Sequence, residues 1–126
     1  MTKERLYIFD TTLRDGAQTQ GVHFSIDEKT KIAHALDNLG VDYIEGGWPG
    51  ANPTDDNFFK KISRQSKSRL VAFGMMRKSG KSASNDPGLN AVLNSGVSSV
   101  CLVGKTWDFH VKNALKVSYT ENLDMI

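Results

Sequence analysis

Three polar side chains with complementary chemistry lie within five residues of one another near the start of the chain. Arg14 offers a forked and permanently charged donor, Asp15 an anionic metal ligand and Gln18 a neutral amide. Gly16 lets the backbone turn sharply between them. This combination suits a small, oxygen-rich anion held on a metal ion. The residues alone leave open a plainer alternative, in which Arg14 and Asp15 form a surface ion pair in an ordinary loop.

Four apolar runs have the length and composition of β-strands, and the first of them ends directly at this polar cluster. Helices are expected between the runs, since Ser25 can cap one that ends at Gly40, Thr54 can cap a second, and Asp86 followed by Pro87 can begin a third. Nearly continuous apolar strands that alternate with helices predict an α/β fold with a parallel sheet covered by helices. The expected strands are 5–9, 41–45, 69–74 and 99–103.

The spacing of these elements bears on the size of the fold. Strands recur at intervals of about thirty residues, as in repeated βαβ units. The chain has 126 residues, whereas a barrel of eight such units needs roughly 250. Residues 113–126 have helical propensity without a stop signal. We therefore expect residues 1–126 to be one domain, the first half of a TIM (β/α)8 barrel with about four βα units, and the sequence to break off near a helix.

Composition argues against several classes of protein. The formal net charge is +2 and basic residues are interspersed with acids, so no nucleic acid is expected as a partner. No stretch approaches the length of a membrane span, and the N-terminus lacks a signal-peptide pattern. The one cysteine, Cys101, lies in an apolar run and fits a buried thiol in a reducing compartment better than a disulfide or a nucleophile. We expect a cytoplasmic metabolic enzyme.

Two further residues become candidates because the carboxyl ends of parallel strands meet at one edge of the sheet. Glu45 ends an apolar strand, where a carboxylate must be paired, metal-linked or functional, and a salt bridge to a neighbouring strand is the structural alternative. His110 follows the fourth strand, although a lone histidine there is more often packed or solvated than catalytic. Asp108 is expected to cap the next helix. His23 and His34 are expected to be structural, since neither has metal-ligand spacing to another histidine.

Two glycine–lysine segments invite comparison with a phosphate-binding loop, and both fail on spacing. The segment 74–82 has five residues between its glycines, where that loop has four. The segment 104–106 lacks the upstream glycine, because Ser99 occupies its place. Nucleotide hydrolysis is therefore not expected.

Three segments together resemble a known family. The segments 9–18, 43–50 and 104–111 are similar to the first, second and fourth strand motifs of the acyl-CoA-dependent 2-oxoacid condensing enzymes. That family includes isopropylmalate, homocitrate and citramalate synthases, and it is related more distantly to hydroxymethylglutaryl-CoA lyase. The resemblance runs over nearly the whole chain. Within the family, the segments 43–53, 77–81 and 104–110 look most like the citramalate type, which condenses pyruvate with acetyl-CoA in isoleucine biosynthesis.

The resemblance implies a role for each candidate residue. Asp15 would bind a divalent metal, Mg²⁺, Mn²⁺ or Zn²⁺, and Arg14 would neutralise the oxyanion of the condensing carbonyl. Glu45 would help to position and polarise the reactants. Gln18 and His110 would line the site of the 2-oxoacid, and acetyl-CoA would be the co-substrate. The physical chemistry agrees, because a metal and an arginine polarise a ketone and stabilise the charge that develops on its oxygen.

The resemblance also frames the alternatives. The leading interpretation is an acetyl-CoA:2-oxoacid acyltransferase that makes citramalate and is a homodimer when full length. A 2-isopropylmalate or homocitrate synthase is the alternative within the family, and Ala17, where many relatives carry glutamate, bears on this subgroup. The loop with Arg77, Lys78 and Lys81 either is solvated or meets the phosphates of coenzyme A.

The family's His-x-His metal ligands and its C-terminal regulatory region have no counterpart in residues 1–126. One carboxylate holds a catalytic metal poorly. These residues alone are therefore expected to be inactive, and a non-catalytic half-barrel is the alternative from another class of protein.

Overall fold

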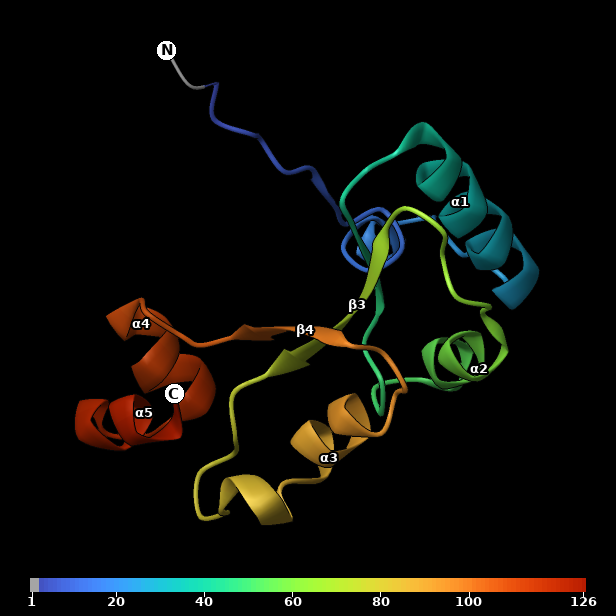
Figure 1. Cartoon of the computed structure of the whole chain (residues 1–126). Coiled ribbons are helices and arrows are strands. Elements are labelled where there is room, and N and C mark those ends of the chain that lie inside the picture. Colours follow the sequence, from blue (N-terminus) through green and yellow to red (C-terminus); the bar gives the residue numbers. More distant parts are fainter. Residues whose placement is uncertain (1–2) are drawn as a thin grey trace.

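The strands of this protein are parallel and pair in the order in which they occur in the sequence. The computed structural model describes residues 3–126. Its strands are β1 (Phe9–Asp10), β2 (Tyr43–Gly47), β3 (Arg69–Met75) and β4 (Ser99–Val103). Within the described range they form one four-stranded sheet of order β1-β2-β3-β4 (Figure 1). Because every pair is parallel, the carboxyl ends of all four strands lie at one edge of the sheet.

The first strand, β1, is much shorter than the predicted run 5–9. The Asp42 carboxylate accepts a hydrogen bond from the Ile8 N–H at 2.9 Å and pairs with the Arg5 guanidinium. The Asp42 side chain thus accepts from the Ile8 N–H, which in a regular strand would donate to a backbone carbonyl oxygen of the neighbouring strand. Leu6, in the same run, is 85% exposed. The apolar run is held beside β2 without regular strand geometry, so its prediction as a full strand is wrong.

A helix joins β1 to β2, and its ends agree with the sequence. In α1 (Ile26–Leu39), Ser25 forms a capping box with Glu28, in which each side chain accepts from the other residue's backbone N–H. Gly40 ends the helix in the left-handed region, at φ 88°.

Among the residues that the structure describes, no helix is long and apolar enough to cross a bilayer.

The next two connecting helices also begin at side-chain caps. The predicted cap of α2 (Pro53–Lys61) at Thr54 is wrong, because Asn52 accepts the N–H three residues along at 2.9 Å and proline takes the first helical position. The predicted start of α3 (Pro87–Leu93) at Asp86 and Pro87 is observed, and Asp86 is its cap. Proline fits the first turn of a helix without losing a hydrogen bond, so in both helices the capping residue precedes it.

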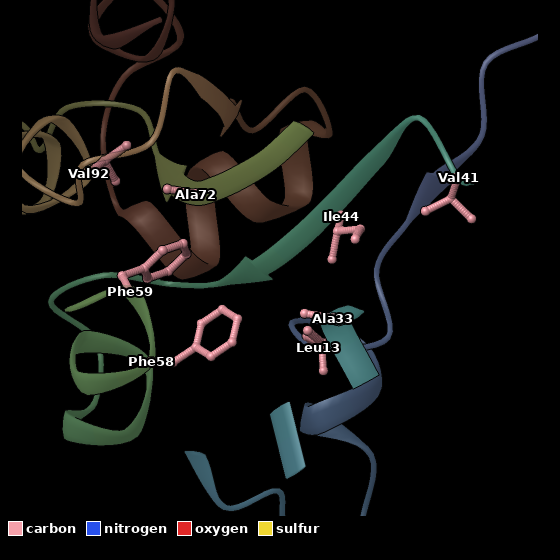
Figure 2. Packing of buried hydrophobic residues seen from close by; sticks show 8 residues of the cluster. All are labelled: Leu13, Ala33, Val41, Ile44, Phe58, Phe59, Ala72 and Val92. Carbon is pink, nitrogen blue, oxygen red and sulfur yellow. The ribbon is translucent and has the colours of Figure 1, made fainter. Parts of the chain in front are cut away.

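The hydrophobic core lies between β2 and the helices that pack on it (Figure 2). Ile44 and Phe58 are fully buried, and truncation of a phenylalanine in such a place costs about 3–5 kcal/mol. Gly46 passes so close that an added Cβ would lie 2.7 Å from a ring carbon of Phe58. Side chains alternate along a strand, so Glu45 faces away from these helices. The buried cluster comprises Leu13, Ala33, Val41, Ile44, Phe58, Phe59, Ala72 and Val92.

Beyond β4 the chain forms short helical segments instead of one helix. In order, they are α4 (Asp108–His110), a π-helical turn (Val111–Leu115) and α5 (Tyr119–Met125). Helical structure is present over 113–126, as expected, but it is interrupted because Lys116 adopts a left-handed conformation at φ 57° and Ser118 caps a new helix. Asp108 is the first residue of α4 and not its cap, as the preceding Trp107 has extended backbone.

Candidate active site

An arginine and a buried carboxylate join the loop after β1 to β2. The Arg14 Nε donates to the Glu45 Oε2 at 2.7 Å. The Glu45 side chain is only 1% exposed and that of Arg14 is 18% exposed. A buried carboxylate needs a partner to offset the loss of its hydration. Arg14 supplies that partner, so the salt bridge to a neighbouring element that the sequence left open for Glu45 is present.

The ring of Phe73 packs against the guanidinium of Arg14, and Trp48 packs against that ring. The Arg14 Cζ lies 4.2 Å from the ring centroid of Phe73, within cation–π range. The indole of Trp48 meets Phe73 edge-on, with centroids 5.2 Å apart. Phe73 is in β3 and Trp48 directly follows β2. The plane of Arg14 is therefore held by Glu45 in β2 and by Phe73 in β3, and the sequence identified neither Phe73 nor Trp48 as a candidate site residue.

Asp15 lies on the solvent side of this pair. Its Oδ1 accepts from the Arg14 Nη1 at 3.1 Å, while its side chain is 66% exposed. A tight turn carries both residues, and a single acceptor stabilises it: the backbone N–H groups of Arg14, Asp15 and Gly16 all donate to the Thr11 carbonyl oxygen. A 3₁₀ turn, Gly16–Gln18, follows. The backbone thus holds the polar cluster in a compact bend.

Gln18 and Arg14 share a cavity of about 330 Å³ between the loops that follow β1 and β2. Its walls include Trp48 and two residues of a buried ion pair, Lys29 and Asp55. A volume of this order accommodates a small metabolite. The remaining residues that line it are Ala17, Val22, His23, Phe24, Ala51, Asn52 and Thr54.

The sequence offered signals for some of these residues. Lys29 shares the buried face of α1 with Ala33, one turn later, and a charged residue on such a face needs a partner. His23 was expected to be structural, and it lines the cavity from an exposed loop position. No spacing pattern marks His23, because the residues that it meets across the cavity are distant in sequence.

His110 lies farther along the same edge of the sheet, at the end of α4. Its ring packs edge-on against Trp107, with centroids 4.7 Å apart, and lies 6.4 Å from the ring of Phe109. The structure thus brings Arg14, Asp15 and Glu45 into direct contact and places Gln18 on the adjoining cavity. His110 instead belongs to an aromatic cluster beyond β4.

The donor set for a metal is incomplete in this part of the protein. Within residues 3–126 no group of three His, Cys, Asp or Glu side chains gathers in a way that could hold a metal ion. Asp15 is anionic and accessible, so it fits as one ligand, but a catalytic divalent ion requires several.

The basic loop after β3 is largely committed to internal contacts. The Arg77 guanidinium pairs with Asp124 and lies 3.8 Å from a Glu121 carboxylate oxygen, both in α5. It also donates to the backbone carbonyl oxygen of Lys81 at 3.0 Å. Arg77 therefore ties this loop to α5, which leaves the exposed Lys78 and Lys81 as the cations of the loop that face solvent.

Cys101 in β4 is partly exposed instead of buried. Burial raises the pKa of the Cys101 thiol, and the Glu45 carboxylate raises it further through its charge and a hydrogen bond, while Arg14 opposes this effect. A raised pKa favours the protonated thiol, which is a weaker nucleophile than the thiolate.

Comparison with known proteins agrees with this fold. The HMGL-like family matches residues 5–126. The (R)-citramalate synthase of Sulfolobus acidocaldarius is 48% identical over 128 residues, which cover 100% of this chain and 24% of that protein. That of Aquifex aeolicus is 47% identical over 98% of this chain and 24% of its own length. The 2-isopropylmalate synthase of Sulfurisphaera tokodaii is 34% identical over 100% of this chain and 31% of its own. The chain thus spans about a quarter of the length of the citramalate synthases.

A solved structure supports the architecture. The hydroxymethylglutaryl-CoA lyase of Bacillus subtilis superimposes with a TM-score of 0.73 at 21% identity, over 98% of this chain and 40% of that protein. At this identity the likeness concerns the fold alone. The predicted α/β fold, with parallel βα units that form the first half of a TIM barrel, is confirmed.

Proposed function

The chain belongs to the HMGL-like family, and from this we infer that the whole protein is an acyltransferase that condenses acetyl-CoA with a 2-oxoacid. We propose pyruvate as the 2-oxoacid and citramalate as the product. The citramalate synthases among its relatives share 44–48% of its residues, whereas the 2-isopropylmalate synthases share 33–40%. Such an activity belongs to the biosynthesis of branched-chain amino acids.

The observation that carries this proposal is the fixed orientation of Arg14 beside the cavity. A guanidinium has five N–H donors, and the contacts with Glu45 and Asp15 use two of them. Glu45 and Phe73 hold the plane of the group, so the other donors keep a constant direction. Donors that are oriented before the reaction stabilise developing charge without reorganisation, which is the main requirement for attack on a ketone.

The roles of the residues follow from the atoms that change. A carbon–carbon bond forms between the methyl carbon of acetyl-CoA, which loses a proton, and the carbonyl carbon of pyruvate. The carbonyl oxygen becomes an alkoxide and then takes a proton, and water cleaves the thioester to release coenzyme A. Arg14 faces the alkoxide, and Glu45 orients Arg14. Gln18 and His110 are proposed to contact the oxoacid.

The cofactors and assembly belong to the same proposal. A divalent cation, Mg²⁺, Mn²⁺ or Zn²⁺, supplies Lewis acidity at the ketone when bound, with Asp15 as one ligand and the others from outside residues 3–126. The whole protein is proposed to act as a cytoplasmic homodimer.

Release of free thiol from acetyl-CoA by the intact protein tests this function. With Mg²⁺ or Mn²⁺ present, release should be fastest with pyruvate. Faster release with 2-oxoisovalerate or 2-oxoglutarate would reassign the protein to the isopropylmalate or homocitrate type. Absence of release with every 2-oxoacid of the panel would reject the acyltransferase assignment.

A second candidate, a non-catalytic half-barrel that associates with another chain, is favoured by apolar exposure at the open side of the sheet. Val100 and Leu102 in β4 are 47% and 51% exposed, and Leu123 in α5 is 73% exposed. Unpaired strand edges with apolar side chains promote association. Sedimentation of the 126-residue chain tests this candidate, since a stable monomer at all concentrations would count against it.

A further inference from the structure

A buried ion pair links α1 to α2 beside the proposed active site. Lys29 in α1 pairs with Asp55 in α2, and their side chains are 2% and 11% exposed. The Lys29 ammonium also lies 5.1 Å from the ring centroid of Phe58. Removing two charges from water costs several kcal/mol per ion, so apolar side chains of similar volume often provide equal stability. Stability alone therefore gives no reason for charges at this place.

The carboxylate of Asp55 holds the loop that follows β2. Its Oδ2 accepts from the Trp48 backbone N–H at 2.8 Å and from the Asn52 side-chain amide at 3.0 Å, while its Oδ1 meets Lys29. The carboxylate also fills the space beside Gly47, where an added Cβ would lie 2.6 Å from the Asp55 Cγ. Both oxygens are thus used, and Lys29 fixes the direction in which they point.

This anchor is connected to Arg14 through aromatic contacts. Asp55 holds the backbone of Trp48, the Trp48 indole packs on the Phe73 ring, and Phe73 lies under the Arg14 guanidinium. Lys29 and Asp55 also form part of the wall of the cavity that Arg14 and Gln18 line. A displacement of the loop would therefore change both the shape of the cavity and the support of Arg14.

We propose that Lys29 and Asp55 are positioning residues, whose ion pair fixes residues 48–52 and, through Trp48 and Phe73, the orientation of Arg14. The catalytic part of this proposal rests on the proposed function, in which Arg14 stabilises the alkoxide. The structural part stands independently of any reaction. An ion pair is suited to this task because its hydrogen bonds are directional, whereas apolar contacts are not.

Hydrogen exchange of the unmodified, intact protein is the first test. The Trp48 amide should exchange slowly for a loop position, because its hydrogen bond to Asp55 must open first. Exchange at the rate of a free loop, read by mass spectrometry on overlapping peptides that begin before residue 46 and differ by Trp48, would overturn the proposal. This result does not depend on whether any variant folds or on whether the protein is an acyltransferase.

The second test separates positioning from stability. The double variant Lys29→Met/Asp55→Leu removes both charges together, so it leaves no buried charge without its partner. It does leave the Trp48 N–H without its acceptor, so its melting temperature should lie below that of the wild type but above that of Lys29→Met. Its Trp48 amide should exchange at least about tenfold faster. Its kcat for thiol release should fall by roughly 10- to 100-fold with little change in KM, because a misplaced catalytic group affects the transition state. Lys31→Met, at an exposed position of the same helix, is the control and should change none of these quantities.

The outcomes are distinct. A double variant that keeps the wild-type kcat and a slowly exchanging Trp48 amide would show that the pair is only structural. Complete absence of thiol release from the unmodified protein would reject the proposed function, while the exchange of Trp48 would still decide whether the anchor exists. Single replacement by Lys29→Met should lower the melting temperature more than the double variant does, because it leaves the Asp55 charge buried without its partner.

Discussion

Replacement of Arg14 by lysine keeps the positive charge and removes the planar fork, so it isolates the geometry on which the proposed function depends. The arginine makes three contacts: Nε with Glu45 at 2.7 Å, Nη1 with Asp15 at 3.1 Å, and the Phe73 ring 4.2 Å from its Cζ. An ammonium group is a compact point charge and cannot make the three contacts together.

The expected loss of stability is modest. The hydrogen bond to the buried Glu45 is worth about 1.5–3 kcal/mol, of which a lysine recovers a part. The contact with the exposed Asp15 contributes about 0–1 kcal/mol, and the stacking on Phe73 about 0.5–1 kcal/mol. Arg14→Lys should thus lower the free energy of unfolding by about 1–2 kcal/mol. Its effect on turnover should be larger, since loss of an oriented oxyanion donor lowers kcat by about 100- to 1,000-fold.

Thiol release by the intact protein measures the turnover, and chemical unfolding measures the stability. Arg5→Lys is the matched control, because Arg5 also pairs with a carboxylate, that of Asp42, but its side chain is 70% exposed and precedes β1. This control should lose less than about 1 kcal/mol and keep its turnover. If Arg14→Lys keeps kcat within about threefold of the wild type, Arg14 is not the oxyanion donor that the reasoning requires.

Three further substitutions test other parts of the structure. Asp15→Asn should cost less than about 1 kcal/mol of stability but lose metal affinity and turnover together, as titration calorimetry and thiol release would show; unchanged turnover would return Asp15 to a surface role. Burial raises the pKa of the Asp37 carboxyl, but hydrogen bonds from residues 66–68 outweigh this and hold the pKa well below its usual range. The ionised Asp37 therefore stabilises the fold above the unfolded pKa of about 3.9, and this contribution is lost as pH falls below that value. Asp37→Asn should cost about 2–4 kcal/mol at neutral pH and, in urea unfolding, show a shallower loss of stability between about pH 4 and pH 2. Equal slopes of stability against pH for variant and wild type would contradict this role of Asp37. Gly46→Ala should cost about 1–3 kcal/mol by thermal unfolding, because its Cβ would lie 2.7 Å from Phe58, and an unchanged melting temperature would show that the ring moves freely.

Local signals in the sequence predicted most of the fold. The Ser25 cap, the helix end at Gly40 and the helix start at Asp86 and Pro87 each depend on a few neighbouring residues, and all were observed. The pairing of Arg5 and Ile8 with the Asp42 carboxylate could not be predicted, because it joins residues more than thirty positions apart and replaces a regular ladder. Asn52 caps α2 in place of Thr54 because the adjacent Pro53 fits the first helical position, so the cap must precede it.

The polar residues of the candidate site could be predicted from the sequence, because they lie at or just after the carboxyl ends of two predicted strands. Arg14, Asp15 and Gln18 are close in sequence, and the parallel arrangement predicted that Glu45 would join them. The aromatic support by Trp48 and Phe73 was not predictable, because apolar residues in or after strands most often serve the core.

The sequential order of the strands has a consequence for biosynthesis. Each strand pairs with the one completed just before it: Tyr43 aligns with Phe9, Arg69 with Tyr43, and Ser99 with Val71. A chain that leaves the ribosome from its N-terminus therefore presents, at each stage, a finished edge to which the next strand can add. Within residues 3–126 each strand after β1 adds to its neighbour in sequence, so loop-closure entropy is lost in small increments. During synthesis the most recently added edge is the surface most exposed to mispairing with other chains, and in the described part of this protein that edge is β4.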